Sequence, residues 1–452
     1  MKACLSKLGL IANKDDTGVP SLSRLHLSAA DSTEVSQIVK GFSEVITSED
    51  SQQLIKAEHD TFLLEKPSSF GVQNLVQALP KVVQDILPNS IANQSSTNSP
   101  EDPSSETKNE VESGGIVDYD KVVKSLVAHE TSLPESKETP YFNHNAFYAN
   151  LKHYNSFSSN SNIVFGKTLL YGEVVTSTST LLEKNPTLIS KLPQGLTATA
   201  TTQVAGRGRG NNVWVSPPGS LMFSTLLRHA LDLNTRAPVV FIQYLAALAI
   251  VSGIQNYDVG YENLPVRLKW PNDIYALDPS KTTAGPQRFP NKELTEDQRA
   301  AYVKIGGILV NSSYSGGDYT LVVGIGLNVS NASPTTSLNQ LAQKASLPPF
   351  TLEKLLASIL TQFEILYTRF CVSGFSKEFE ALYYSYWLHA GQVVTLEQES
   401  GVKAVIRGIT RDWGLLVAEE LGWEDRPTGK KWELQSDSNS FDFFRGLLKR
   451  KV

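Results

Sequence analysis

Apolar and polar positions alternate most regularly between about residue 145 and residue 385, where the pattern predicts a dense folded region. Residues 266–270 show the two-residue period of a strand, and residues 302–331 predict two strands joined by a Gly-Gly-Asp turn. The longest apolar stretch covers residues 239–254. Its 16 residues are fewer than the ~20 that a bilayer requires, so it predicts a buried helix and not a membrane span.

The first 140 residues have a weaker pattern. Apolar residues recur at helical spacing between Val35 and Ile46, which predicts one helix there. Residues 91–140 are rich in Ser, Asn, Pro and Glu, and such a segment buries too little apolar surface to offset its chain entropy. We expect a small unit over 1–90, a disordered linker over 91–140, a large domain over 141–387 and a β-rich domain over 388–452.

Charge is distributed unevenly along the 452 residues, whose net charge is −5. Residues 1–140 hold 12 Lys and Arg against 21 Asp and Glu, a net charge of −9, whereas the remainder carries +4. The acidic segment argues against a DNA-binding module there, because phosphate contacts need Lys and Arg. The only cysteines, Cys4 and Cys371, and seven scattered histidines exclude a disulfide framework and a zinc cluster. No signal peptide is evident, and we expect a cytoplasmic protein.

A glycine–arginine loop stands between two predicted strands. Gly206, Gly208 and Gly210 alternate with Arg207 and Arg209. Glycine lets the backbone approach a ligand closely, and arginine presents planar donors to phosphate or carboxylate oxygens. The spacing matches neither GxGxxG nor a Walker loop. An RGG-like nucleic-acid segment and a plain surface loop stay open as alternatives, although this motif occurs once and between strands.

Three further places carry polar residues that suit a ligand. Asn272-Asp273 ends a strand and has the oxygen atoms to hold Mg²⁺ or ribose, although for this segment alone an ordinary Pro-Asn-Asp turn is the favoured interpretation. Lys304 lies in an otherwise apolar strand beside Gly306-Gly307, where a lysine either reaches solvent or meets an anion. Residues 177–179, Ser-Thr-Ser, either cap a helix or hydrogen-bond a small polar ligand.

The motifs are much more specific together than singly. They occur in the order GRGRGNNVWVSPPGSL, KWPNDIY, KIGGILV and GIGLNV. In this order they closely resemble the biotin protein ligases, also called holocarboxylase synthetases, over about residues 160–450. The long N-terminal extension resembles the eukaryotic, fungal-type branch, in which a large non-catalytic half precedes the ligase domain. Residues 1–90 resemble only the end of such a half, as expected of an N-terminally shortened form, a fragment or a truncated gene model.

The resemblance implies an α+β fold. It implies a class II synthetase-like catalytic domain, with a mixed or antiparallel sheet packed by helices, followed by a C-terminal SH3-like β-barrel. The implied enzyme makes biotinyl-5′-AMP from biotin and ATP, releases pyrophosphate, and transfers biotin to one lysine of a biotin-carrier domain. ATP with Mg²⁺ and biotin are the expected substrates, without a permanently bound cofactor. The expected partners are biotin-dependent carboxylases, such as acetyl-CoA and pyruvate carboxylases, with no nucleic acid and no membrane.

The resemblance also assigns roles to residues. The implied catalytic residues are Lys304, Arg207 and Arg209, with Lys304 as an electrostatic stabiliser and not a nucleophile. The implied biotin-binding residues are Ser177, Thr178, Ser179, Gln203, Gly206, Arg207, Gly208, Arg209, Lys304 and Gly307. The implied ATP-binding residues are Arg209, Trp214, Asn272, Asp273 and Asn328. No metal site is expected beyond the Mg²⁺ that ATP carries.

Two other functions stay open. One is a lipoate or octanoate ligase-type acyltransferase of the same superfamily, which the combination of GRGRG and KWPND disfavours. The other is a non-enzymatic nucleic-acid binder that uses the glycine–arginine loop. That function predicts repeated RGG triplets or an exposed basic patch, and the sequence has neither.

Overall fold

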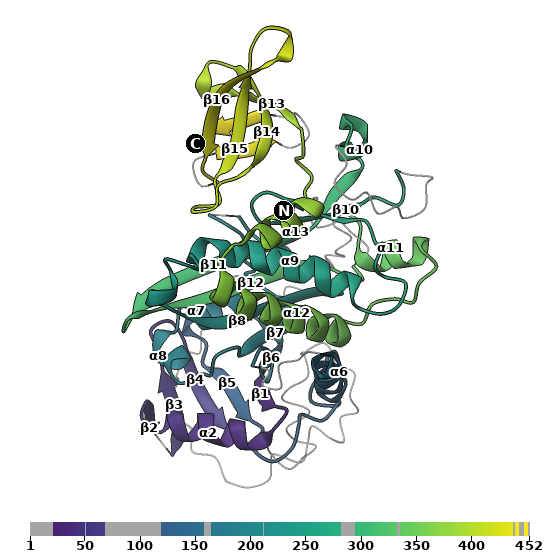
Figure 1. The fold of residues 1–452 in the computed structure, drawn as a ribbon. Helices are drawn as coiled ribbons and strands as arrows, with labels where there is room; N and C mark the ends of the chain where they lie inside the picture. The colour runs from purple at the N-terminus through teal and green to yellow at the C-terminus, as the bar shows by residue number, and fades with distance from the viewer. Residues whose placement is uncertain are drawn as a thin grey trace, which may run out of the picture.

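The computed structural model describes residues 21–49, 51–67, 119–157, 164–210, 212–281, 294–331, 335–436, 439–442 and 447–450. Within these ranges the chain forms one large sheet packed by helices and a second, smaller β domain near the C-terminus (Figure 1). The α+β prediction is therefore confirmed. The second sheet begins at Val393, close to where the sequence placed the β-rich domain.

The large sheet has twelve strands among the described residues, in the order β2-β3-β4-β5-β1-β6-β7-β8-β12-β11-β10-β9. Their bounds are β1 Leu25–Ala29, β2 Ile46–Glu49, β3 Gln52–Lys56, β4 Thr61–Glu65, β5 Lys124–Ala128, β6 Thr168–Val175, β7 Thr197–Gln203, β8 Ser220–Ala230, β9 Val266–Lys269, β10 Asp273–Leu277, β11 Tyr302–Ser315 and β12 Asp318–Asn328. The sheet is mixed, because β6 runs parallel to β7 while the strands from β7 to β9 pair antiparallel in succession.

Both faces of the large sheet are covered. Along β6, Leu169 and Tyr171 join one buried core and Leu170 joins a second core, as strand alternation requires. The helices that contribute to the first core are α6 His144–Ser156, α9 Ile242–Gln255, α11 Leu338–Lys344, α12 Leu352–Ser373 and α13 Lys377–Ser385. Those that contribute to the second are α2 Ser32–Phe42, α7 Thr178–Glu183 and α8 Pro186–Ser190. The remaining described α-helix is α10, Glu296–Ala300.

The predicted buried helix is confirmed as α9, almost all of whose residues are buried. The sequence pattern did not single out a longer apolar helix, α12. By length and composition its 22 residues could cross a membrane, but most of the apolar window is buried inside the protein. Glu364 of α12 is also buried, and its carboxylate accepts hydrogen bonds from the backbone N–H groups of Val164 and Phe165. α12 therefore packs as a core helix of the large domain.

The predicted separation of an N-terminal unit from the large domain is wrong. Strand β5 lies inside the predicted linker, yet it pairs parallel with both β1 and β4. β1 in turn pairs antiparallel with β6, so the first five strands extend the large sheet directly. The linker prediction fails for residues 119–140 because the polar composition of the preceding run obscured the short apolar segment Leu126–Ala128. The rest of that prediction, residues 91–118, lies outside the described residues.

The C-terminal domain contributes six described strands, in the order β16-β15-β14-β13-β18-β17. Their bounds are β13 Val393–Leu396, β14 Val402–Ile409, β15 Leu416–Leu421, β16 Pro427–Leu434, β17 Asn439–Asp442 and β18 Leu447–Arg450. The turn between β14 and β15 contacts the large domain. There the Gly414 carbonyl accepts hydrogen bonds from the Tyr244 hydroxyl at 2.6 Å and from the Trp270 indole N–H at 3.1 Å.

Candidate active site

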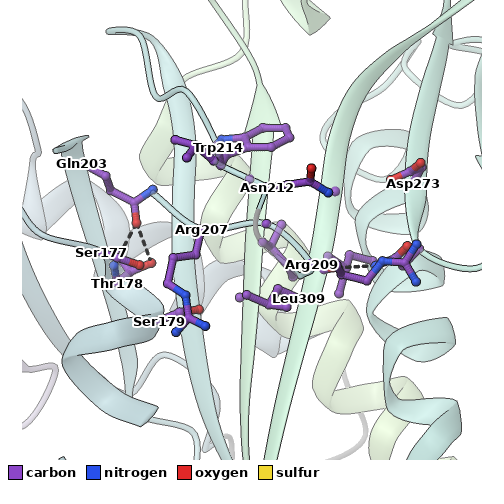
Figure 2. A pocket seen from close by; sticks show the side chains of 18 of the residues that line it. Ser177, Thr178, Ser179, Gln203, Arg207, Arg209, Asn212, Trp214, Asp273 and Leu309 are labelled. Carbon is purple, nitrogen blue, oxygen red and sulfur yellow. Dashed lines mark hydrogen bonds between the residues drawn. The ribbon is translucent and has the colours of Figure 1, made fainter. Parts of the chain in front are cut away.

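A cavity of about 440 Å³ opens at the ends of β6 and β7 and continues across β11 and β12. Figure 2 shows its side chains, with Gln203 and residues 177–179 on one side and Asp273 on the other. The cavity is lined by Ser177, Thr178, Ser179, Gln203, Arg207, Gly208, Arg209, Asn212, Val213, Trp214, Asn272, Asp273, Lys304, Gly307, Ile308, Leu309, Gly324, Ile325 and Gly326. Segments that are more than 100 residues apart in the sequence therefore meet in one place.

One end of the cavity is a cluster of hydroxyl and amide groups. Ser177 is the N-cap of α7, so the helix-cap interpretation is correct, and yet residues 177–179 also line the cavity. The Gln203 side-chain oxygen accepts hydrogen bonds from the Thr178 backbone N–H at 2.8 Å and from its hydroxyl at 3.3 Å (Figure 2). Ser224, which the sequence did not single out, lies 2.9 Å from the Thr178 hydroxyl and 3.2 Å from that of Ser179. These polar groups are held at fixed positions by one another.

A glycine makes room for this cluster. A Cβ atom on Gly324 of β12 would lie 2.4 Å from the Ser179 hydroxyl and 3.3 Å from that of Ser224. Contacts under 3.0 Å require the neighbouring atoms to move. The absence of a side chain at Gly324 is thus what allows Ser179 to reach the cavity floor.

The glycine–arginine loop folds into a hairpin at the cavity. Arg207 and Val213 form an isolated antiparallel bridge, and the Gly208 N–H donates to the Asn212 carbonyl at 2.8 Å. The Arg207 guanidinium pairs with Glu183, the last residue of α7. Arg209 lines the cavity. Both arginines therefore line the cavity, and this placement disfavours an RGG-like nucleic-acid segment.

Trp214 ends the loop and lies against the floor. Its backbone N–H donates to the Gly206 carbonyl at 2.9 Å, which closes the hairpin. A Cβ atom on Gly326 would lie 2.6 Å from the Trp214 ring, so the indole packs directly on the backbone of β12. Among the described residues, the buried indole nitrogen of Trp214 has no hydrogen-bond partner. It is a donor available to a ligand.

Lys304 belongs to a group of three charges. Its ammonium lies 2.7 Å from one oxygen of Asp273, and Lys269 lies 3.5 Å from the other oxygen. Burial lowers the pKa of Lys269, while the Asp273 charge opposes that shift. Lys304 also lies 5.9 Å from the centre of the Trp214 ring. The group carries one more positive than negative charge, which suits an anionic ligand.

A β-bulge sets the direction of Lys304. The register of β10 on β11 passes from Ile274 opposite Gly306 to Tyr275 opposite Lys304, leaving Ile305 without a counterpart. An extra residue in one strand bends it and redirects the neighbouring side chains. As a result, a Cβ atom on Gly307 would lie within 3.6 Å of the Lys304 ammonium. The lysine therefore reaches over Gly307 into the cavity.

Asn272 and Asn328 have different positions. Asn272 is buried at the cavity wall, where its amide donates to the Ile308 carbonyl while its side-chain oxygen has no partner among the described residues. Asn328 ends β12, and its amide donates to the Thr335 hydroxyl at 3.2 Å. Thr335 donates in turn to the Lys304 carbonyl at 2.9 Å. Asn328 thus holds the segment after β12 near Lys304 from outside the cavity.

The structure brings together all the site residues implied by the sequence except two. Gly206 and Asn328 do not line the cavity, and both act on residues that do. The sequence analysis missed Glu183, Ser224 and Lys269. Of these, only Lys269 carried a signal, because it precedes Asp273 by four positions within the KWPND motif. The partners of Glu183 and Ser224 depend on contacts between distant segments.

Comparisons with known proteins identify relatives of this chain. Residues 171–328 match the biotin/lipoate A/B protein ligase family. The chain is 42% identical over 295 residues to the biotin–protein ligase of Schizosaccharomyces pombe, a match that covers 64% of this chain and 44% of that protein. It is 33% identical over 291 residues to the human biotin–protein ligase, covering 63% of this chain and 35% of the relative. The chain thus spans less than half the length of these two relatives.

A third relative is matched over most of its length. Biotin–protein ligase 2 of Arabidopsis thaliana is 33% identical over 298 residues, which cover 64% of this chain and 78% of that protein. Among solved structures, the biotin protein ligase of Aquifex aeolicus in complex with biotin and ATP aligns with a TM-score of 0.42 and 24% identity. That alignment covers 63% of this chain and 99% of the other. On the strength of the sequence matches, the chain belongs to the biotin–protein ligase family.

Proposed function

We propose that this chain is an ATP-dependent biotin ligase that activates biotin as biotinyl-5′-AMP and transfers it to a lysine of a biotin-carrier domain. One observation carries the proposal. A single cavity joins a fixed cluster of hydroxyl and amide groups to three cationic side chains, Arg207, Arg209 and Lys304. The polar cluster suits a ureido head, and the cations suit the carboxylate and phosphate that must react.

The chemistry explains why both ends are needed. In the first step a biotin carboxylate oxygen attacks the α-phosphorus of ATP, the bond to the β-phosphate breaks, and pyrophosphate leaves. In the second step the carrier lysine amine attacks the acyl carbon, AMP leaves, and an amide forms. Two anions must approach each other in the first step, and fixed positive charge in a cavity that excludes water lowers that barrier.

The polar cluster supplies selectivity for the head group. The hydroxyls of residues 177–179 and the amide of Gln203 can hydrogen-bond a buried urea. A site built to hydrogen-bond its substrate rejects an analogue without those groups more strongly than an apolar slot does, because its own polar groups would stay unpaired. Lipoate and octanoate lack the urea, so the cluster favours biotin.

The cationic end serves the nucleotide. We propose that Arg209 and Lys304 contact the reacting carboxylate and phosphate oxygens, and that Asp273 and the Asn272 side-chain oxygen face the Mg²⁺ that ATP carries. Oxygen ligands suit Mg²⁺, and the unpartnered oxygen of Asn272 fits this role. Among the described residues no group of three acidic, histidine or cysteine side chains is arranged to hold a metal. We propose that Mg²⁺ enters with ATP.

Carrier domains are the proposed acceptors. They are the biotin-carrier domains of carboxylases, such as acetyl-CoA and pyruvate carboxylases. The family membership supports an acceptor lysine on a carrier protein in general, and the particular carboxylases are the finer part of the proposal.

Biotin transfer is the direct test. The full chain is incubated with biotin, MgATP and an isolated biotin-carrier domain, and the mass of the carrier is measured. We expect one biotin on the carrier lysine. In Lys304→Ala, the rate of adenylate formation should fall about 100-fold or more, because removing one group that stabilises transition-state charge costs about 2.7–4 kcal/mol.

The control is Lys281→Ala, which removes a half-exposed lysine that lies 4.0 Å from Asp278 and does not line the cavity. It should transfer biotin at the wild-type rate. Pyrophosphate release that depends on lipoate and not on biotin would contradict the proposed substrate. Wild-type activity in folded Lys304→Ala would contradict the proposed role of the lysine.

A further inference from the structure

We propose that the N-terminal strands position helix α7 for biotin binding, and that Asn185 and Asp60 are the positioning residues. The inference rests on the proposed function, because α7 and its N-cap carry the residues assigned to the biotin head. It assigns a role to a part of the chain that the catalytic chemistry itself does not use.

The contact is a buried polar network between the two parts. Asp60 lies in the turn between β3 and β4, Lys124 begins β5, and Asn185 follows α7. The three side chains are 1%, 3% and 0% exposed. The Lys124 ammonium lies 2.5 Å from one Asp60 oxygen, and the Asn185 amide donates to the other at 2.7 Å. The network therefore joins three segments in the interior.

Asn185 uses both ends of its amide group. Its side-chain oxygen accepts hydrogen bonds from the backbone N–H groups of Asp60 at 2.9 Å and His59 at 3.3 Å. Its side-chain nitrogen also donates to the Leu181 carbonyl of α7 at 3.1 Å. One side chain thus ties the β3–β4 turn to the end of α7. A second tie lies next to it, where the Glu58 carboxylate accepts from the Thr187 N–H at 3.0 Å and from its hydroxyl at 2.7 Å.

Both ends of helix α7 contact residues that line the cavity. At its start, Thr178 and Ser179 belong to the polar cluster. At its end, Glu183 pairs with Arg207 of the glycine–arginine loop. The helix has only six residues and Asn185 stands two positions beyond it, so a displacement at Asn185 moves the whole element. The biotin-head cluster and the loop arginine would both shift.

Apolar packing alone would not fix this position. Leu181 and Leu182 share a core with Ile55 and Phe62, but hydrophobic contact is non-directional. A buried ion pair with a hydrogen-bonded amide gives little net stability, since desolvation offsets the attraction, and what it does supply is one allowed geometry. The placement of this network at the turn beside α7 therefore points to positioning.

The test compares biotin binding with ATP use in the full chain. Asn185→Ala removes the side-chain hydrogen bonds that join the end of α7 to Asp60 and His59. We expect its dissociation constant for biotin, measured by calorimetry without ATP, to rise about tenfold at a temperature where circular dichroism shows a folded protein. The KM for MgATP should change less than about twofold. A purely structural role would lower thermal stability and leave biotin affinity unchanged.

Two matched variants test whether biotin binding depends on the hydrogen bonds of Asn185, on the buried charges, or on any contact between the N-terminal strands and the large domain. The double variant Asp60→Asn with Lys124→Met removes both buried charges and keeps an amide oxygen for Asn185, so it should bind biotin within about threefold of wild type. Glu34→Gln removes the ion pair between α2 and Lys167, another link between the N-terminal strands and the large domain that does not touch α7. It should bind biotin like the wild type.

The outcomes are distinct. If Asn185→Ala does not fold, Glu58→Ala takes its place. Glu58 is exposed, and its loss should weaken biotin binding about two- to fivefold. Wild-type affinity in a folded Asn185→Ala, or in Glu58→Ala where that variant replaces it, would overturn this inference alone. A wild-type chain that binds no biotin would overturn the proposed function and this inference with it.

Discussion

At the scale of single residues, the cavity depends on where side chains are missing. Gly324 and Gly326 are two positions apart on β12, so they face the same side of the sheet. Ser179 occupies the space above the first, and Trp214 occupies the space above the second. The same strand therefore accepts the polar cluster and the loop tryptophan because neither position carries a side chain.

Gly324→Ala is predicted to impair biotin binding. Its Cβ atom would lie 2.4 Å from the Ser179 hydroxyl, and overpacking of this kind typically costs about 1–3 kcal/mol. We expect the KM for biotin to rise about tenfold or more, measured by steady-state pyrophosphate release. Gly41→Ala is the matched control, because a Cβ atom on Gly41 of α2 meets nothing within 4 Å. An unchanged biotin KM in Gly324→Ala would show that the hydroxyl cluster does not bind the substrate.

The motif residues could be predicted from the sequence, whereas their partners could not. Lys304 stands out in an apolar strand, and its position beside two glycines indicates an anion site. Its pairing with Asp273 depends on the bulge at Ile305, which no local pattern reveals. Ser224 looks like any small residue of a buried strand, and its role follows only from its contact with Thr178 and Ser179.

At the scale of elements, the turn between β14 and β15 contacts the large domain beside the Asn272 wall of the cavity. The Gly414 carbonyl accepts two hydrogen bonds, from Tyr244 of α9 and from the Trp270 indole. Trp270 stands two positions before Asn272 in the same tight turn. The C-terminal domain thus contacts a residue two positions away from one that lines the cavity.

Tyr244→Phe is predicted to weaken this contact. The substitution removes the hydroxyl from a fully buried site and leaves the Gly414 carbonyl with one hydrogen bond. The free energy of unfolding should fall by about 1 kcal/mol, the usual contribution of such a bond. We expect the KM for MgATP to rise while the dissociation constant for biotin, measured without ATP, stays near the wild-type value. The reverse pattern would place the turn on the biotin side.

Elements were predicted well where their pattern is strong. The helix at residues 239–254 and the two strands at 302–331 have long, regular patterns, and all three elements are present. β5 was missed because it has only five residues and follows a long polar run. Its place in the sheet comes from pairing with β1 and β4, a long-range contact that composition does not encode.

At the scale of the whole molecule, buried histidines lie where the N-terminal strands meet the large domain. His26 of β1 lies 3.0 Å from His129, nitrogen to nitrogen, and His144 begins α6 nearby. Burial, with the neighbouring histidine charges, lowers the pKa of His26 and of His144 to about 3. Burial also lowers the pKa of His129. The contact between the N-terminal strands and the large domain therefore favours neutral imidazole side chains.

The free energy of unfolding is predicted to decrease as the pH is lowered, because of these buried histidines. The unfolded chain protonates His26 and His144 near pH 6.5, while the folded chain resists their protonation until about pH 3, so the unfolded state binds more protons between those values. Stability is fully present above pH 6.5 and is lost as the pH falls below it, by up to about 1.4 kcal/mol per pH unit for each histidine. Thermal unfolding midpoints between pH 7.5 and 5.5 measure the effect.

His26→Gln should reduce this slope, because it removes one of the groups that the fold keeps neutral. Gly41→Ala is the control, because it removes no titratable group and its added Cβ atom meets nothing within 4 Å, so the slope should stay unchanged. A His26→Gln chain with the full wild-type slope would show that other groups set the pH dependence.

The β11–β12 hairpin has a consequence for the reaction rate. It supplies Lys304, Gly307 and Gly324 to the lining of the cavity, and ten backbone pairs hold its strands in register. The strand pairing therefore fixes the position of Lys304 relative to Gly324, the glycine that makes room for Ser179 of the polar cluster. Under the proposed function, such an arrangement would raise the effective molarity of the biotin carboxylate at the α-phosphorus, because part of the entropy of alignment is lost on binding and not again at the transition state.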